Sequence, residues 1–259
     1  MSSRGVASYN EPERRPPSRK SLPTAFVQAF RELLSEALAS TDSASGKQLG
    51  SCIGVYAFYD YDGEPIYVGQ TAENFRTRIG RHLTGQRSDT LAYRILDPFE
   101  VAEMQLWPAE YLRGDPQKVA KLNALEYSVY INAIDDSKYH AILNEKIPPR
   151  SARVELGRSF RFPLFPEDMR DEREHPDVRI ARRAETLARV AAVAHERGEV
   201  SSGLRRVIVI QAVRLADLAA ARLAYSEGRR GPSSDAIDVQ ELVGNVMAEF
   251  ASDGDDDEL

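Results

Sequence analysis

Two β-rich runs joined by one tight turn constrain this chain more than any other feature. Residues 54–69 read GVYAFYDYDGEPIYVG, and Asp62-Gly63 near the centre supplies the positive φ that a tight hairpin requires. Side chains alternate between the faces of a strand, so each face of the hairpin collects its own kind of residue. One face holds Tyr56, Phe58 and Tyr67, and the other holds Val55, Ala57, Ile66 and Val68. The aliphatic face suits a core.

A two-residue turn also fixes the register of this hairpin. It places Tyr56 opposite Gly69. Phe58 then lies opposite Tyr67, and the two tyrosines become diagonal neighbours about 7–8 Å apart. Tyrosines are common in half-buried strands, however, so these two alone do not define a site.

A helix is expected after the hairpin, capped by Thr71 and running to about Leu83. Its apolar stripe is Phe75, Ile79 and Leu83, and a second stripe at the same spacing is Asn74, Arg78 and His82. A guanidinium is suited to stabilising charge on phosphate, because it donates bidentate hydrogen bonds and keeps its proton. A histidine four residues after an arginine is, by itself, usually incidental.

A carboxylate on an apolar helix face is the third feature. Pro116 is well placed to open a helix that runs to about Ile134. Glu126 falls on its apolar face, four residues after Leu122. A buried carboxylate is costly unless it is paired or binds a cation. Two interpretations stay open from the residues alone, namely an ion pair with an arginine and ligation of a metal ion.

Taken in order, these residues resemble the signature of the GIY-YIG nucleases. The matching positions are Gly54-Val55-Tyr56, Tyr67-Val68-Gly69, Arg78, His82, Glu126 and Asn144. Glu126 matches the family's metal-binding glutamate and Asn144 its late catalytic asparagine. The resemblance covers roughly residues 53–146, with valine at the centre of each tripeptide. It implies an α+β fold, a small three-stranded antiparallel sheet flanked by helices, to which the strand-like segment 101–107 would contribute. An additional helical C-terminal region follows.

The resemblance also implies a reaction and a role for each residue. The reaction is hydrolysis of a DNA phosphodiester bond with one divalent metal, Mg²⁺ (or Mn²⁺), held by Glu126. Tyr56 resembles the tyrosine proposed as general base toward the attacking water, and His82 would assist the movement of the proton. Tyr67 would orient the nucleophile or the phosphate, and Arg78 would stabilise the transition state.

The charge of the chain is uneven. Its net charge of −6 argues against a nucleic-acid partner, but five acids stand in the last seven residues. Cations concentrate in the segments 75–94 and 146–161, and local basic patches matter more for phosphate contact than the sum. The candidates for DNA contact are Arg76, Arg81, Arg87, Arg94, Lys146, Arg150 and Arg153. Any single one of these cations has the plainer interpretation of a residue that solvates a helix face.

Composition and periodicity divide the chain into five parts. Residues 1–20 are expected to form a disordered arm and residues 21–45 an N-terminal helix. The nuclease-like domain spans 46–168. A helical C-terminal region follows at 172–252, and an acidic tail occupies 253–259. The helices expected in the C-terminal region cover 178–196, 204–226 and 237–250.

Cysteine content and hydropathy exclude several classes of protein. Cys52 is the only cysteine, which excludes an internal disulfide and a cysteine-based zinc site. No apolar run approaches the roughly 20 residues that a membrane span needs, and the N-terminus lacks the apolar core of a secretory signal. A cytoplasmic protein without a membrane partner fits these features best.

Three functions remain open from the sequence. The first is a nuclease of restriction, defence or mobile elements. The second is a DNA-repair nuclease, for which no helix-hairpin-helix signature appears. The third is a catalytically silent module that binds DNA or a protein, against which the intact set of catalytic residue types argues. Four roles remain open for the C-terminal helices. They could bind DNA, form a homodimer, dock a partner protein or pack against the nuclease core.

Overall fold

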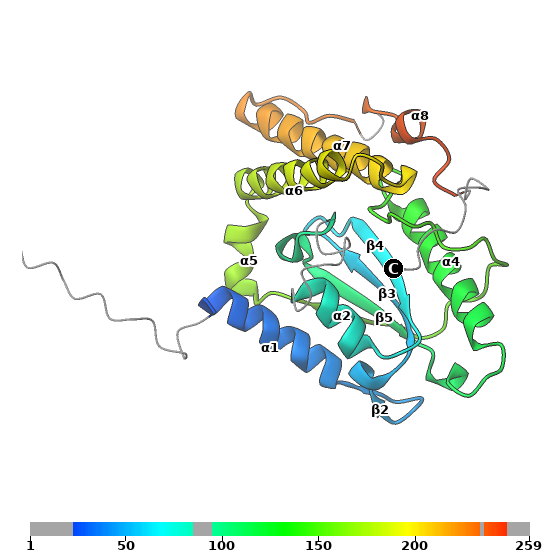
Figure 1. Cartoon of the computed structure of the whole chain (residues 1–259). Helices are drawn as coiled ribbons and strands as arrows, with labels where there is room; N and C mark the ends of the chain where they lie inside the picture. The colour runs from blue at the N-terminus through cyan, green and yellow to red at the C-terminus, as the bar shows by residue number, and fades with distance from the viewer. Residues whose placement is uncertain (1–22, 85–94, 234–235, 248–259) are drawn as a thin grey trace, which may run out of the picture.

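A four-stranded antiparallel sheet forms the centre of the fold (Figure 1). The computed structural model describes residues 23–84, 95–233 and 236–247. The strands lie in the order β4-β3-β5-β6, with bounds β3 Gly54–Tyr59, β4 Pro65–Thr71, β5 Glu103–Pro108 and β6 Phe160–Pro163. The α+β class and the three expected strands are confirmed. The fourth strand, β6, was not predicted, because its four residues, alternately half-buried and exposed and ending in proline, are too few to establish a period.

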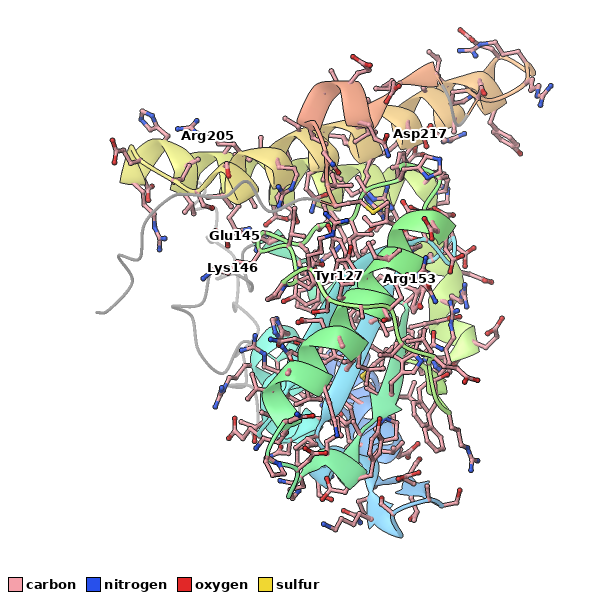
Figure 2. The ribbon with its side chains drawn as sticks, turned by 90° about the vertical axis from the view of Figure 1, so that its right-hand side faces the viewer. Tyr127, Glu145, Lys146, Arg153, Arg205 and Asp217 are labelled. Carbon is pink, nitrogen blue, oxygen red and sulfur yellow. The ribbon has the colours of Figure 1, made fainter. Side chains whose placement is uncertain are left out.

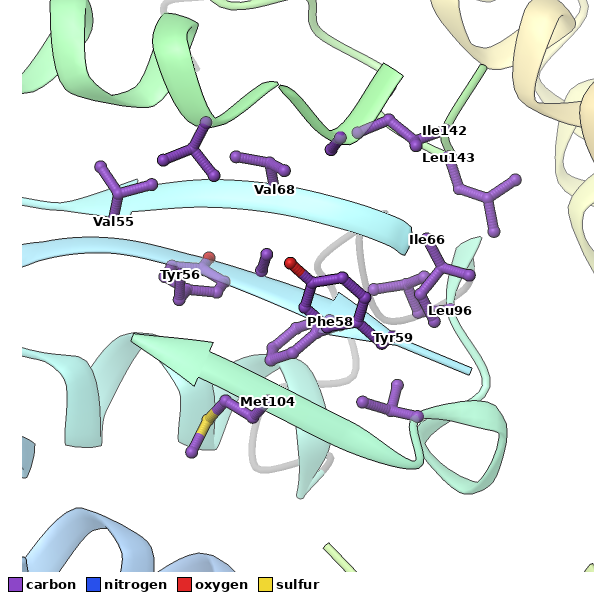
Figure 3. Close-up of a cluster of buried hydrophobic side chains, with 14 of the residues drawn as sticks. Val55, Tyr56, Phe58, Tyr59, Ile66, Val68, Leu96, Met104, Ile142 and Leu143 are labelled. Carbon is purple, nitrogen blue, oxygen red and sulfur yellow. The ribbon is translucent and has the colours of Figure 1, made fainter. Parts of the chain in front are cut away.

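The register of the hairpin is as predicted. Tyr56 pairs with Gly69 and Phe58 with Tyr67, and a bulge follows Phe58. Gly63 in the turn has φ 74°, a conformation that side-chain-bearing residues rarely adopt. Tyr56, Phe58 and Tyr67 therefore lie on one face of the hairpin, and Val55, Ala57, Ile66 and Val68 lie on the other (Figure 3).

Helices cover both faces of the sheet (Figure 1). On one face lie α1 (Ala25–Ala39) and α2 (Phe75–Leu83), and on the other lies α4 (Lys118–Asp136). The ring of Phe75 meets the ring of Tyr56 edge-on, which places α2 over the aromatic face of the hairpin. The remaining short elements are β1 (Thr41–Asp42), β2 (Lys47–Gln48), η2 (Leu49–Ser51), η3 (Pro98–Glu100) and η4 (Glu110–Leu112).

One local prediction needs correction, and two further local features bear on the site. Thr71 ends β4 and does not cap α2, because Asn74 takes that place and its side chain accepts from the Thr77 amide at 2.8 Å. Val119 of α4 is 64% exposed and lies off the buried face. The segment Ala141–Asn144 is an extended loop without strand pairing, although the Leu143 amide donates to the Ile66 carbonyl at 2.8 Å.

The C-terminal helices pack across one end of the sheet. They are α5 (Glu167–Glu174), α6 (Pro176–Arg197), α7 (Ser202–Ser226) and α8 (Val239–Val243). Figure 1 shows α6 and α7 side by side above the strands. The helix expected over 237–250 is much shorter, because Gly244 leaves the helical conformation at φ 72°. Its last residues lie outside the described part of the chain.

A buried group of ion pairs joins these helices to the β3–β4 turn. The Asp60 carboxylate, which follows β3, lies 2.8 Å from Arg214, 2.9 Å from Arg183 and 3.3 Å from Arg179. We call these four residues the Asp60 cluster. Its arginines come from α6 and α7, so the turn between the two tyrosine-bearing strands is held by the C-terminal helices.

Several predictions fall on residues that the structure does not describe. These are the arm at 1–20, the acidic tail at 253–259, and the DNA-contact candidates Arg87 and Arg94. Within the described ranges, none of the helices combines the length and hydropathy that a bilayer crossing demands.

Candidate active site

Four of the six predicted site residues line one pocket at the edge of the sheet. The pocket has a volume of about 420 Å³, and Tyr67, Arg78, Glu126 and Asn144 are among its lining residues. They come from β4, α2, α4 and the loop after α4. Tyr56 and His82 are not among the lining residues, and both side chains are buried. The fold thus brings the predicted set to a single place.

Glu126 reaches the pocket although α4 covers the opposite face of the sheet from α2. Because β4 is the edge strand, side chains from helices on both faces meet beyond it. Burial raises the pKa of the Glu126 carboxyl to about 7, and the charge of Arg78 offsets this only in part. In the described part of the chain Glu126 forms no ion pair, so its charge is poorly balanced.

Arg78 provides the opposite charge on the same pocket. Its Nε is buried and has no hydrogen-bond partner among the described residues. Burial opposes the charged form, but the neighbouring hydroxyls of Tyr56 and Tyr67 outweigh it, so the pKa of Arg78 is raised. The guanidinium is therefore cationic at every accessible pH and has donors to spare for an anion.

Tyr56 and His82 form a buried hydrogen-bonded pair. The Tyr56 hydroxyl lies 2.9 Å from His82 Nε2. Burial, together with the charges of Arg78 and Arg81, lowers the pKa of His82 to about 4, so the imidazole is neutral at physiological pH. Burial also raises the pKa of Tyr56 well above its ordinary value, which keeps the phenol protonated at rest. The pair holds one exchangeable proton between two neutral groups.

Gly69 makes room for the Tyr56 hydroxyl. A Cβ on Gly69 would lie 2.5 Å from the Tyr56 oxygen, and atoms do not approach so closely without displacement. The opposition of Tyr56 and Gly69 in the hairpin register thus has a steric reason. The ring of Tyr67 lies beside that of Tyr56, with centroids 6.2 Å apart, and burial raises the pKa of Tyr67 to about 12.

Asn144 closes the edge of β4 with its side-chain amide. Its Oδ1 accepts from the Val68 amide at 3.0 Å, and its Nδ2 donates to the Val68 carbonyl at 2.8 Å. The backbone of Asn144 and Glu145 is held in turn by Arg206 of α7, which donates to their carbonyl oxygens at 3.4 and 3.0 Å. A helix of the C-terminal region thereby supports the wall of the pocket.

The predicted DNA-contact residues are spread over several surfaces. Lys146 lines the pocket and is exposed, and Arg150 is exposed two positions after the lining residue Pro148. Arg153 donates to Asn132 on α4, and Figure 2 shows it on a different side of α4 from Lys146. The remaining two described candidates, Arg76 and Arg81, lie on α2 and outside the pocket.

Sequence reasoning missed two residues that shape the site. Gln70 faces α4, donates to Asn123 at 2.6 Å and is near enough to the Glu126 carboxyl to lower its pKa slightly against burial. The alternation of side chains along β4 could have indicated the position of Gln70, because it lies on the same face of the strand as Val68. Arg206 had no such signal, because more than sixty residues separate it from the loop that it holds.

The donor set fits a divalent cation held by a single carboxylate. In the ranges that the structure covers, no three His, Cys, Asp or Glu side chains gather as a metal site. A cation beside Glu126 would remove the imbalance that raises its pKa. The pocket has room for the water and phosphate oxygens that complete the coordination of such an ion.

The pocket at the edge of β4 thus combines Tyr67, the guanidinium of Arg78 and the half-buried carboxylate of Glu126. Residues 52–112 match the family model described as the GIY-YIG catalytic domain. This segment of the chain is thus similar to the catalytic domain of the GIY-YIG nucleases. Neither the curated proteins nor the solved structures contain a match to the chain. The matched segment includes Tyr56, Tyr67, Arg78 and His82 and ends before Glu126 and Asn144.

Proposed function

We propose that this protein is a divalent-metal-dependent endonuclease that hydrolyses phosphodiester bonds in DNA. One observation carries the proposal: Arg78 and Glu126 face the same pocket, and neither forms an ion pair within the described residues. Free charges of opposite sign around one hollow are costly unless a ligand balances both. A phosphate with its metal ion balances the guanidinium and the carboxylate together.

Glu126 would hold the cation, Mg²⁺ or Mn²⁺, through its carboxylate oxygens. Bound there, the ion would neutralise charge on the scissile phosphate and stabilise the leaving 3′-oxygen. Arg78 would donate to the non-bridging oxygens, where negative charge increases in the transition state.

Tyr56 and His82 would move the proton of the attacking water. As the Tyr56 oxygen takes a proton from water, its own proton passes to His82 Nε2 across 2.9 Å. This transfer requires a neutral imidazole with its hydrogen on Nδ1, so that Nε2 can accept, and the lowered pKa of His82 provides the neutral ring at physiological pH. Tyr67 would orient the phosphate from the pocket wall, and Asn144 would keep β4 in position through Val68.

Cleavage of plasmid and linear DNA tests the proposal. The full chain would be incubated with supercoiled plasmid in Mg²⁺, Mn²⁺, Ca²⁺ or EDTA, beside Arg78→Gln and Glu126→Gln. We expect nicking or linearisation with Mg²⁺ or Mn²⁺ and none with EDTA. Each variant should lose activity by a factor of about 100 or more, the usual scale for a group that stabilises transition-state charge.

Matched controls come from the far end of α7. Arg230→Gln and Glu227→Gln remove the same charges from exposed positions beyond that helix and should cleave like wild type. If wild type and both pocket variants behave alike, the enzymatic proposal fails. Metal binding to Glu126→Gln with wild-type affinity would remove Glu126 from its assigned role.

We further propose that this endonuclease acts in restriction, defence or mobile-element biology. Such enzymes cut at particular sequences, so digestion of a defined genome should yield discrete fragments with a common end sequence. A repair nuclease would instead cut DNA that carries a lesion, a flap or a branch. Cleavage confined to damaged or branched substrates would replace the restriction role by repair.

A further inference from the structure

A second polar groove lies on the other side of α2 from the catalytic pocket. It separates α2 from α1 and has a volume of about 540 Å³. Its polar lining residues are Arg31, Ser35, Arg76, Thr77, Arg81 and Thr84. No carboxylate is among the described residues that line it. The two leucines in the lining, Leu34 and Leu38, are buried, so the groove offers cations and hydroxyls rather than an apolar surface.

The three arginines of this groove are poorly neutralised. Arg31 is exposed and has no partner in the described ranges. Arg76 makes one long hydrogen bond, 3.5 Å from its Nη2 to the Leu38 carbonyl. Arg81 pairs with Glu73 at 3.2 Å in an exposed ion pair that contributes little. The groove therefore keeps most of its positive charge available for an anion.

The outward face of α2 connects the groove to the catalytic pocket. With 3.6 residues per turn, Arg81 lies next to Arg78 around the helix, and Thr77, Gly80 and Arg76 follow. The nine residues of α2, FRTRIGRHL, include no acid and only small or basic side chains on this face. Small side chains let a sugar-phosphate backbone approach a helix closely. A helix about 10–12 Å wide is crossed by roughly three phosphates at 3.4 Å of rise each.

We propose that the α1–α2 groove binds the phosphodiester backbone of the DNA on one flank of the cleavage site. The inference rests on the proposed function and extends it, since it makes α1, which lies outside the matched family segment, part of the substrate-binding surface. Arg31 is the residue of α1 that carries the contact. Arg76 and Arg81 continue the contact toward Arg78.

Salt-dependent DNA binding tests this proposal. Affinity of the full chain for a labelled duplex would be measured by fluorescence anisotropy in Ca²⁺ over a range of salt concentrations. Each lost phosphate contact lowers the slope of log K against log salt by about 0.9. Arg31→Gln should therefore lower the slope by about 1 and weaken binding several-fold at low salt. Arg31 is exposed, so folding should be intact, which circular dichroism checks.

A matched control and a truncated duplex sharpen the measurement. Arg230→Gln, at an exposed site beyond α7, should keep the wild-type slope. Once the cleavage position is mapped, shortening the duplex on one flank should weaken wild type more than Arg31→Gln, and shortening the other flank should weaken both equally.

The outcomes separate the two proposals. If the chain cleaves DNA and Arg31→Gln keeps the wild-type slope, the groove assignment is wrong and the nuclease proposal stands. If DNA binding depends on Arg31 but no metal supports cleavage, the nuclease proposal is wrong and the groove still binds DNA. Tighter binding of an RNA duplex of equal length would overturn the choice of DNA as the ligand.

Discussion

Removing the charge of Asp60 should destabilise the fold more than any other single neutralisation near the hairpin. The Asp60 side chain is 2% exposed and accepts from Arg183 at 2.9 Å and Arg214 at 2.8 Å. Asp60→Asn keeps the shape of the side chain, so the substitution creates no cavity. It removes the counter-charge that three buried guanidinium groups share. Glu100 then remains beside Arg179 and Arg183, and Glu64 remains beside Arg214 at 3.7 Å.

The size of the effect follows from burial. Deleting one partner of a buried ion pair costs about 3–5 kcal/mol, because the remaining charge stays desolvated. Domains are stable by only about 5–15 kcal/mol, so this loss is a large part of the free energy of unfolding. Each kcal/mol moves Tm by about 2–4 °C in a domain of this size, which predicts a decrease on the order of 10 °C.

Asp62→Asn is the matched control. Asp62 lies two residues further on in the same turn and binds Arg179 with both oxygens, at 3.0 and 2.8 Å. The Asp62 side chain is 48% exposed, and the buried Arg179 keeps Asp60 and Glu100 as partners, so the loss should be about 1 kcal/mol. Urea denaturation followed by circular dichroism compares the two variants. Equal losses, or a loss below about 1 kcal/mol for Asp60→Asn, would refute the argument from burial.

Three further predictions concern the site and its support. The raised pKa of Glu126, about 7, means that protons compete with metal, so Mn²⁺ affinity measured by calorimetry should rise between pH 6 and 8 and stay flat in Glu126→Gln. The pKa of His82 is lowered to about 4, so its NMR signals should report a neutral ring at pH 5.5. Its contribution to stability is full above the unfolded pKa near 6.5 and is lost as pH falls through 4. In Gly203→Ala the new Cβ would lie 1.9 Å from the Glu145 carbonyl oxygen, and calorimetric melting should show a loss of about 1–3 kcal/mol.

The pairing of the hairpin could be predicted because its information is local. Alternation set the two faces, and the expected pairing of Tyr56 with Gly69 is observed. The expected two-residue turn is wrong, because the Asp60 amide donates to the Glu64 carbonyl at 3.0 Å, which leaves three residues between them. The bulge between Phe58 and Tyr59 offsets the additional residue and restores the predicted register.

The attachment of the C-terminal helices could not be predicted in the same way. Asp60 and Arg214 are 154 residues apart, and each alone looks like an ordinary charged residue at a turn or on a helix. Arginines in an Ala-rich helix normally indicate a solvated face, yet Arg179, Arg183 and Arg214 are almost completely buried. Sequence alone does not distinguish an arginine that is buried beside a carboxylate from an arginine on a solvated helix face. Only the tertiary fold makes this distinction.

The position of the pocket follows from how the sheet ends. An edge strand exposes backbone donors and acceptors that need partners, and a further strand beside β4 would satisfy them. That strand would also fill the space where Tyr67, Arg78 and Glu126 meet. Here the side chain of Asn144 pairs with both the amide and the carbonyl of Val68 instead. Together with the Leu143 amide, which donates to the Ile66 carbonyl, this side chain satisfies part of the edge of β4. The space beside it stays open to side chains from both faces of the sheet. A carboxylate from α4 and a guanidinium from α2 can face one phosphate only at such an edge.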